Sequence, residues 1–420
     1  MSAVKPRWPA ALALAGALLG TTFAALSSSD YAKHLDRQIH DVHCSFVPGL
    51  PAASGAENAC RAAMYSPYAA ILRERVWGGV PIALFGLGTY AFFAAFALYL
   101  LLAGPRAPRR AAPFFAVTAQ LPLLASIVMG TISAVKLGQF CKTCVGMYAS
   151  SVLLSVGAIV GVVLARRAAA VPQTWGPAGP ESAEGPREGG WLLIPSWLIG
   201  LGLFSLTPGL LYVGAVPAYG AYIGGCGKLE KPTPPANTLL RLTPRSAVQP
   251  ATLFVDPLCP TCKALHQRLA ADGTLDKLDL SLVLFPLDND CNWMLDRAVH
   301  PGACSVSKAI LCGDHRAGAM LDWAYENQEE LLATAKTEGG GPRVRAMIRE
   351  RWPGLDACID SKDTSLRLNR TLRYIVNNQL PVSTPQMFLG DQRLCDEDTD
   401  MGLAYTVRRL APALADKGAP

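Results

Sequence analysis

Two Cys-X-X-Cys pairs lie in very different surroundings, and both have the spacing that thiol–disulfide exchange requires. Cys141 and Cys144 stand at the beginning of an apolar segment, whereas Cys259 and Cys262 follow a short hydrophobic strand-like run and open a polar helix-like one. A helix that starts at the first cysteine lowers the pKa of that thiol, and the second cysteine lies close enough to resolve a mixed disulfide. The two pairs together predict a protein that passes electron pairs between a soluble partner and the membrane.

Five apolar segments are each long enough for the roughly 20 residues that a bilayer core requires. They are residues 8–26, 80–103, 113–135, 145–165 and 191–215. The composition agrees, since 51% of the residues are hydrophobic and only 17% are charged. After Cys226 the sequence has an ordinary globular composition and is long enough for one domain with its own core. The chain therefore combines a membrane part with a soluble part.

Basic residues predict the orientation of these segments. Three clusters fall on one side if every segment crosses: Lys5 and Arg7; Arg106, Arg109 and Arg110; and Arg166 and Arg167. The positive-inside rule makes that side cytoplasmic, so the loop 27–79, the first cysteine pair and the C-terminal domain lie outside. The external loop also carries basic residues, so the asymmetry is incomplete. A cleaved signal peptide is the alternative for the first segment, and it leaves the remaining topology unchanged.

Two segments rich in proline or glycine separate the parts of the chain. Residues 168–190 lack periodicity and are expected to form a flexible cytoplasmic linker before the fifth span. Residues 216–249 are expected to form a stiffer external spacer before a domain at 250–420. The formal charge of +6 mostly reflects the topology, and no basic run with interleaved aromatic residues indicates nucleic-acid binding.

Twelve cysteines, most of them on the predicted external side, favour an oxidising compartment. Six lie near or within the soluble domain without an evident redox role: Cys226, Cys291, Cys304, Cys312, Cys358 and Cys395. Six cysteines allow 15 sets of three disulfides, and the sequence alone does not choose among them. Cys291 and Cys304 flank one stretch containing proline and glycine, so they are the favoured pair.

The N-terminal half resembles the bacterial form of the vitamin K epoxide reductase family over residues 8–165. The resemblance rests on motifs in a fixed order. The first are an external cysteine pair, Cys44 and Cys60, and Ser66, which lies six residues after Cys60. They are followed by Gly79-Val80-Pro81 at the start of the second span, by Cys141 and Cys144 at the start of the fourth span, and by Tyr148. It implies a four-helix transmembrane bundle over residues 1–167, to which a fifth transmembrane helix is added.

The same resemblance implies a role for each of these residues. Cys44 and Cys60 would relay electrons from the soluble domain to Cys141, and Cys144 would reduce a membrane quinone, either ubiquinone or menaquinone. The residues implied to lie against the quinone are Cys144, Tyr148 and Ser66. Fifteen residues separate Cys44 from Cys60, about twice the usual number in the family. Loop closure costs only about 0.6 kcal/mol per doubling of length, so the pair can still form.

Residues 250–410 resemble a thioredoxin-fold oxidoreductase of the DsbA type, which implies an α/β domain with a helical insertion. Cys259 and Cys262 are its expected catalytic pair. Thr384-Pro385 has the form of the cis-proline of this fold, which would place backbone beside the Cys259 sulfur. Residues 289–380 are expected to be mainly helical and to form the insertion.

The external loop is also expected to contain a helix over residues 61–76. Its apolar residues would share one face: Met64, Tyr65, Tyr68, Ile71, Leu72 and Val76. Such a helix would lie at the membrane interface and cover the mouth of the bundle. A plain connecting helix is the alternative.

The sequence thus predicts a membrane thiol–disulfide oxidoreductase that forms disulfides in exported proteins. Its partners would be reduced exported proteins, the membrane quinone pool and the lipid bilayer, and its location the bacterial cell membrane with the soluble domain on the periplasmic side. Electron flow in the reverse direction would make it a disulfide reductase or isomerase. Two different hypotheses are a tethered redox chaperone whose bundle is only an anchor, and coincidental buried cysteines at 141 and 144. A zinc site formed by both pairs has the wrong spacing, and no histidine lies at metal-ligand spacing from them.

Overall fold

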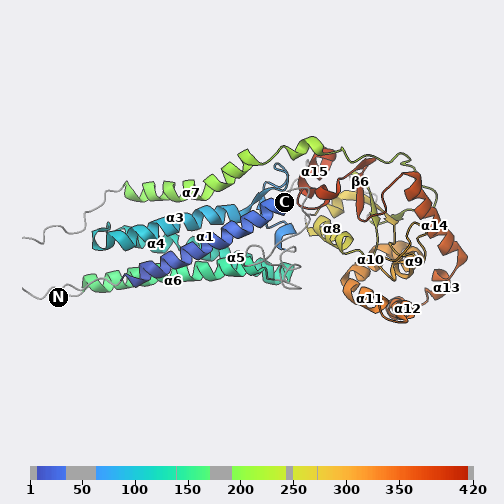
Figure 1. Ribbon diagram of the computed structural model, residues 1–420, viewed down its shortest axis with the longest axis horizontal. Helices are drawn as coiled ribbons and strands as arrows, with labels where there is room; N and C mark the ends of the chain where they lie inside the picture. Colours follow the sequence, from blue (N-terminus) through green and yellow to red (C-terminus); the bar gives the residue numbers. More distant parts are fainter. Residues whose placement is uncertain are drawn as a thin grey trace, which may run out of the picture. The chain divides into compact units, whose positions relative to one another are not determined.

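The computed structural model describes residues 7–34, 63–138, 140–170, 192–242, 249–271 and 273–414 (Figure 1). The chain divides into two units. The first, here called the membrane unit, comprises Met1–Leu72 and Val80–Pro217. The second, here called the C-terminal unit, comprises Arg73–Gly79 and Ala218–Pro420. The expected linker at 168–190 lies almost entirely outside the described residues.

The membrane unit is built of long apolar helices. They are α1 (Trp8–His34), α3 (Ile82–Ala103), α4 (Ala111–Thr118), α5 (Gln120–Ile132), α6 (Lys142–Ala170) and α7 (Leu193–Ala215). A short π-helix at Ser133–Leu137 continues α5, so that α4, α5 and this turn form one span. Within the described residues, five helical segments are long and apolar enough to cross a membrane, which confirms the predicted number.

Close helix contacts hold this bundle together. Helix α1 packs along both α3 and α6, and α7 packs against α3. A Cβ atom on Gly16 would lie 2.6 Å from the backbone nitrogen of Leu154, so this glycine allows α1 and α6 to approach closely. Phenylalanine rings fill the space between α3 and α4, with Phe96 and Phe115 stacked at 5.5 Å. The packing is therefore of the kind expected for helices that associate in lipid.

The segment 61–76, for which the sequence predicts a helix, has another structure. Among its described residues only 63–65 are helical. Strand β1 (Ala70–Ile71) follows and pairs antiparallel with β2 (Val80–Pro81). Both helical interpretations are therefore wrong. The physical reason is that Pro67 disfavours helical geometry at Ser66, and Leu72 adopts a φ of 56°.

The C-terminal unit contains a mixed five-stranded sheet in the order β3-β5-β4-β6-β7. The strands are β3 (Leu240–Arg241), β4 (Gln249–Val255), β5 (Leu278–Leu284), β6 (Gln386–Leu389) and β7 (Gln392–Arg393). Strands β4 and β5 are parallel, and the other neighbouring strands are antiparallel. Helix α8 (Pro260–Ala271) follows β4 in the chain and leads toward β5. This arrangement is the thioredoxin fold that the resemblance implied.

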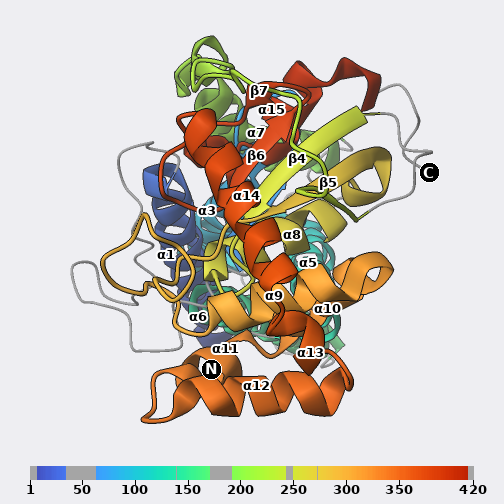
Figure 2. The ribbon, with the colours of Figure 1, turned by 90° about the vertical axis from the view of Figure 1, so that its right-hand side faces the viewer.

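Helices cover both faces of this sheet (Figure 2). Six lie between β5 and β6 in the chain: α9 (Ala303–Gly313), α10 (Ala317–Glu326), α11 (Gln328–Ala335), α12 (Gly340–Arg351), α13 (Asp356–Ile359) and α14 (Lys362–Asn377). Alternate residues of β4 enter different clusters, with Leu253 facing the core around α8 and α9 and Phe254 facing α14. The expected helical insertion is confirmed.

The expected external spacer at 216–249 needs correction. Residues 218–242 belong to the C-terminal unit and include strand β3. Leu229 and Leu240 are buried, and the backbone nitrogen of Lys231 donates to Asn378 Oδ1 at 2.7 Å. The prolines of this segment suggested a spacer, but its two buried leucines pack against the core of the domain.

The short segment Arg73–Gly79 is also part of the C-terminal unit. Trp77 is only 4% exposed, and its Nε1 donates to the buried Asp398 Oδ1 at 2.6 Å. The Trp77 ring lies 4.6 Å from the Tyr219 ring. A Cβ atom on Gly402 would lie only 2.4 Å from Trp77 Nε1. The absence of a side chain at position 402 therefore makes room for the indole. Helix α15 (Leu403–Leu410) begins directly after this glycine.

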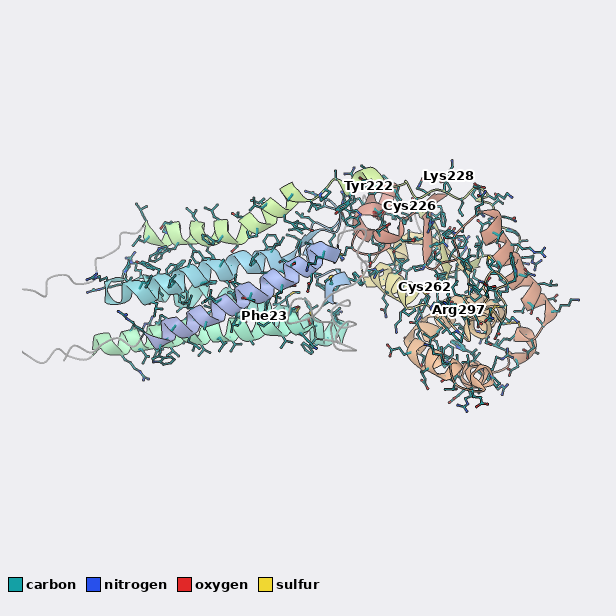
Figure 3. The ribbon with its side chains drawn as sticks, in the orientation of Figure 1. Phe23, Tyr222, Cys226, Lys228, Cys262 and Arg297 are labelled. Atoms are coloured by element: carbon teal, nitrogen blue, oxygen red, sulfur yellow. A yellow bond between two sulfur atoms is a disulfide. The ribbon has the colours of Figure 1, made fainter. Side chains whose placement is uncertain are left out.

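The six remaining cysteines form three disulfides within the C-terminal unit. They are Cys226–Cys395, Cys291–Cys304 and Cys312–Cys358. The favoured pair, Cys291 with Cys304, is confirmed. Cys226 lies in the segment that leads from α7 into the domain (Figure 3).

Candidate functional site

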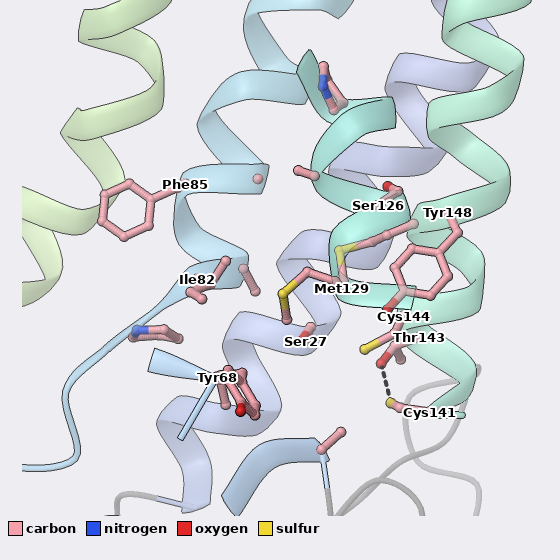
Figure 4. A pocket seen from close by; sticks show the side chains of 18 of the residues that line it. Ser27, Tyr68, Ile82, Phe85, Ser126, Met129, Cys141, Thr143, Cys144 and Tyr148 are labelled. Carbon is pink, nitrogen blue, oxygen red and sulfur yellow. Dashed lines mark hydrogen bonds between the residues drawn. The ribbon is translucent and has the colours of Figure 1, made fainter. Parts of the chain in front are cut away.

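The membrane unit contains a cavity of about 380 Å³. Its walls are mainly apolar and come from the end of α1, the beginning of α3, from α5, from the beginning of α6 and from α7 (Figure 4). This volume and composition are typical of sites for small apolar ligands that carry a few polar groups.

Both cysteines of the first pair line this cavity. Cys141 directly precedes α6 and is 4% exposed, and Cys144 lies in the first turn of the helix. The Sγ of Cys141 lies 3.0 Å from Thr143 Oγ1. Gly138 precedes the pair with a φ of 63°, a conformation that favours glycine, and it ends the π-helix. The chain thereby turns back into the membrane with its two thiols at the cavity.

A few polar side chains interrupt the apolar wall. Tyr148 follows Cys144 by one helical turn and lines the cavity beside α5 (Figure 4). Ser66 also lines it, and its Oγ donates to the carbonyl of Ala63 at 2.8 Å. Tyr90 closes another part of the wall by donating to the carbonyl of Met147 at 3.0 Å. The structure thus brings Ser66, Tyr148 and Cys144 to one cavity. The expected relay cysteines, Cys44 and Cys60, lie outside the described residues.

The second cysteine pair opens helix α8 of the C-terminal unit. Cys259 directly precedes α8 and is 4% exposed, whereas Cys262 is fully buried. The Sγ of Cys259 lies 2.9 Å from Thr261 Oγ1 and 3.5 Å from the carbonyl oxygen of Thr384. The Thr384–Pro385 peptide bond is cis, as the sequence predicts. The backbone before Pro385 therefore lies against the first sulfur of the pair.

The two thiols of this pair have opposite acidities. The hydrogen bond with Cys262 lowers the pKa of Cys259 to about 6, and Thr261 and Thr384 add to this effect and outweigh burial. Burial raises the pKa of Cys262 well above its ordinary value, and the neighbouring Cys259 raises it further. Cys259 is therefore the nucleophile and the good leaving group of the pair, and Cys262 is the thiol that stays protonated.

A buried acid–base pair lies behind this site, and sequence reasoning missed it. Asp256 is fully buried and accepts hydrogen bonds at 2.7 Å from the backbone nitrogens of Leu258 and Leu287. His300 Nδ1 lies 2.8 Å from Asp256 Oδ2. Burial acts to lower the pKa of His300, but the hydrogen bond and charge of Asp256 outweigh it, so the pKa is raised. The position of Asp256, three residues before Cys259, was the available signal.

Among the residues described in the two units, no group of three or more His, Cys, Asp or Glu side chains is arranged to hold a metal ion.

One family model matches part of the chain. Residues 11–159 match the model of the Vitamin K epoxide reductase family, which covers about a third of the chain. No curated protein matches the chain.

Several solved structures are similar to the chain at low identity. Oxidoreductase DsbA from Xylella fastidiosa is 17% identical with a TM-score of 0.31, over 42% of this chain and 96% of that one. A thioredoxin-like oxidoreductase from Silicibacter pomeroyi is 14% identical with a TM-score of 0.27, over 44% and 95%. ScsC from Proteus mirabilis is 15% identical with a TM-score of 0.28, over 53% and 95%.

The chain therefore combines a membrane unit, part of which matches the model of the Vitamin K epoxide reductase family, with a unit that has the thioredoxin fold. One dithiol lines the cavity of the first unit, and the other lies beside the cis-proline of the second.

Proposed function

We propose that this protein forms disulfides in exported proteins and delivers the electrons to a membrane quinone. The observation that carries the proposal is the apolar cavity of about 380 Å³, because Cys141 and Cys144 both line it. A lipid-soluble electron acceptor can reach thiols in such a site, whereas a water-soluble one is disfavoured there.

The C-terminal unit takes the first electron pair. A substrate thiolate attacks Cys259 of the Cys259–Cys262 disulfide, the S–S bond breaks, and Cys262 leaves and takes up a proton. A second substrate thiolate attacks the mixed disulfide, which releases the oxidised substrate and the Cys259 thiolate. The lowered pKa of Cys259 favours this direction, because a low-pKa thiolate leaves more readily.

The electron pair then moves through the cysteines of the membrane unit. Cys259 attacks the Cys44–Cys60 disulfide, with Cys60 as the preferred target, and Cys262 resolves the mixed disulfide. The reduced loop pair transfers the same two electrons to Cys141, with Cys144 as the second thiol of that pair. Each exchange breaks one S–S bond and forms another, so two electrons and two protons move without loss.

The residues at the cavity fit a ubiquinone or menaquinone ring. When bound there, the quinone supplies a site for two electrons and two protons. Cys144 would deliver the electrons, and the apolar side chains around it would limit the access of water. Tyr148 and Ser66 are the polar side chains proposed to position the carbonyl groups of the ring.

We further propose that the C-terminal unit lies on the extracytoplasmic side of the bacterial cell membrane. The positive-inside rule supports this orientation. The three disulfides of the C-terminal unit also support it, because such bonds persist in oxidising compartments. Residues 168–190 would then be the cytoplasmic linker between the fourth and fifth spans.

The test uses the purified full chain in lipid nanodiscs with a reduced substrate protein and either ubiquinone or menaquinone. We expect sustained substrate oxidation coupled to equimolar quinol formation. Cys144→Ala should stop turnover after the disulfides already present are consumed. The double variant Cys312→Ala/Cys358→Ala, which removes a structural disulfide, is the matched control and should keep its quinol yield per substrate. Sustained turnover by Cys144→Ala would remove this residue from the mechanism, and electron flow from quinol to a substrate disulfide would reverse the direction.

A further inference from the structure

A second cavity, of about 190 Å³, lies at the other end of the membrane unit. The first cavity is lined by the beginning of α3 and of α6, whereas the second is lined by residues 100–104, where α3 ends, and by residues 157–165 of α6. Its remaining walls come from the start of α1 and from residues 107–109, which connect α3 with α4. It is therefore separate from the site of Cys141 and Cys144.

Two arginines line this otherwise mainly apolar cavity. Arg7 directly precedes α1 and Arg109 lies in the connection between α3 and α4, and both side chains are exposed. A Cβ on Gly104 would lie 3.8 Å from Arg7 Nη2, so the Arg7 guanidinium reaches across to the end of α3. Gly157 and Gly161 on α6 also line it, and Gly157 lies in close contact with the backbone of α1. The site thus combines cationic groups at the helix ends with an apolar interior.

Positive charge predominates at this end of the bundle. Arg7 and Arg109 are accompanied there by Arg106, Arg166 and Arg167. The described part of the membrane unit contains a single acidic side chain, Asp30, and Asp30 lines the cavity at the opposite end. Anionic groups that approach these arginines from outside the described protein would therefore be attracted to them.

We propose that this cavity binds an anionic phospholipid. The lipid phosphate would lie between Arg7 and Arg109, and the beginning of an acyl chain would lie against the apolar walls of α3 and α6. The place of the cavity at the ends of membrane-spanning helices puts it at the level where lipid headgroups meet the hydrocarbon. Basic pockets between transmembrane helices bind such headgroups by the same combination of charge and apolar contact.

The experiment is a lipid titration of the delipidated full chain in detergent, followed by native mass spectrometry. Phosphatidylglycerol is the anionic probe, phosphatidylcholine the zwitterionic probe and inorganic phosphate the water-soluble probe. We expect phosphatidylglycerol to bind tightly and the other two probes to bind weakly. Arg7→Gln/Arg109→Gln should weaken it about 30-fold, because each arginine contributes a factor of about five. Arg166→Gln/Arg167→Gln removes the same charge outside the cavity and should weaken binding less than about threefold.

A third variant tests the cavity without changing charge. A Cβ on Gly161 would lie 3.7 Å from the Pro9 Cβ, an ordinary contact, so Gly161→Leu should fill the cavity without displacing α1. We expect it to weaken phosphatidylglycerol binding at least tenfold. Equal binding of the two phospholipids, equal loss in both arginine double variants, or full binding by Gly161→Leu would overturn the proposal. Competition by inorganic phosphate at the same concentration as the lipid would assign the site to free phosphate instead.

Discussion

Removal of the Thr261 hydroxyl should raise the pKa of Cys259 and slow its reactions. Thr261 Oγ1 lies 2.9 Å from Cys259 Sγ, and it contributes to the low pKa after the larger effect of Cys262. Valine has nearly the shape of threonine but cannot form this hydrogen bond. Thr261→Val therefore removes one stabilising contact of the thiolate and leaves Cys262 and the cis-proline in place.

The size of the effect follows from the pKa of Cys259, which is lowered from 9.0 to about 6. This lowering of the pKa corresponds to about 4 kcal/mol in favour of the thiolate. We assign about one unit to Thr261, at the lower end of a hydrogen bond to a charged group. The thiolate fraction at pH 6 should then fall from about one half to about one tenth. At pH 7 the reduced form loses about 1 kcal/mol, which makes the pair more reducing by about 20 mV.

The sign of the pH dependence follows from the lowered pKa. The thiolate of Cys259 stabilises the reduced folded protein fully above the ordinary thiol pKa, and this contribution is lost as the pH falls through about 6. The assay is the rate of iodoacetamide alkylation of Cys259 between pH 4 and 9, followed by mass spectrometry of its peptide from the reduced full chain. Thr261→Ser keeps the hydroxyl and should retain the wild-type profile. An unchanged profile in Thr261→Val would refute the assigned role of this contact.

Three further predictions concern the C-terminal unit. Trp77→Ala should lower its free energy of unfolding by about 3 kcal/mol in urea, because a buried indole and its hydrogen bond are lost. Cys312→Ala/Cys358→Ala should lower it by up to about 4 kcal/mol, since the disulfide closes a separation of 46 residues. The raised pKa of His300 means that its ion pair with Asp256 stabilises the fold fully below about pH 6.5 and less as the pH rises through the raised pKa. His300→Gln should abolish this fall in stability, measured as the urea midpoint between pH 5 and 9.

Each of these predictions has an outcome that contradicts it. Trp293 is 56% exposed, so Trp293→Ala should lower the free energy of unfolding much less than Trp77→Ala does. Equal losses in the two variants would show that the burial of Trp77 is not the cause. Equal urea midpoints with and without a reducing agent would contradict the contribution of the 312–358 disulfide. If the urea midpoint of His300→Gln depends on pH as that of the wild type does, another titrating group causes the dependence.

The predictable parts of this protein are those that local sequence decides. Apolar runs long enough to cross a bilayer identify the five spans, and the Cys-X-X-Cys pairs identify the starts of α6 and α8. The cis form of Thr384–Pro385 and the Cys291–Cys304 disulfide are predictable too, since each depends on a short stretch of chain. Each of these features depends on residues that lie close together in the sequence.

The unpredictable parts depend on contacts between distant residues. The Cys226–Cys395 disulfide spans 169 residues, and no local pattern marks its partners. Trp77 contacts Asp398 across an even greater separation, and the apolar spacing just before it indicates an amphipathic helix instead. That spacing is misleading because Pro67 disfavours helical geometry at Ser66 and Leu72 adopts a φ of 56°. Strand β3 escapes prediction because only the pairing with β5 makes a strand of two residues.

The two reactive cysteine pairs share more local geometry than their surroundings suggest. Each has threonine before its second cysteine, and each threonine hydroxyl lies near the first sulfur, at 3.0 Å for Thr143 and 2.9 Å for Thr261. The difference between the pairs therefore arises from what surrounds them. The Thr384 carbonyl beside Cys259 belongs to the backbone between the cis-proline and the preceding bend, next to strand β6, whereas Cys141 and Cys144 line an apolar cavity. In the proposed function, the same dithiol unit is thus directed to different partners by its environment, and the choice of partner depends on the cis-proline and the cavity rather than on the motif.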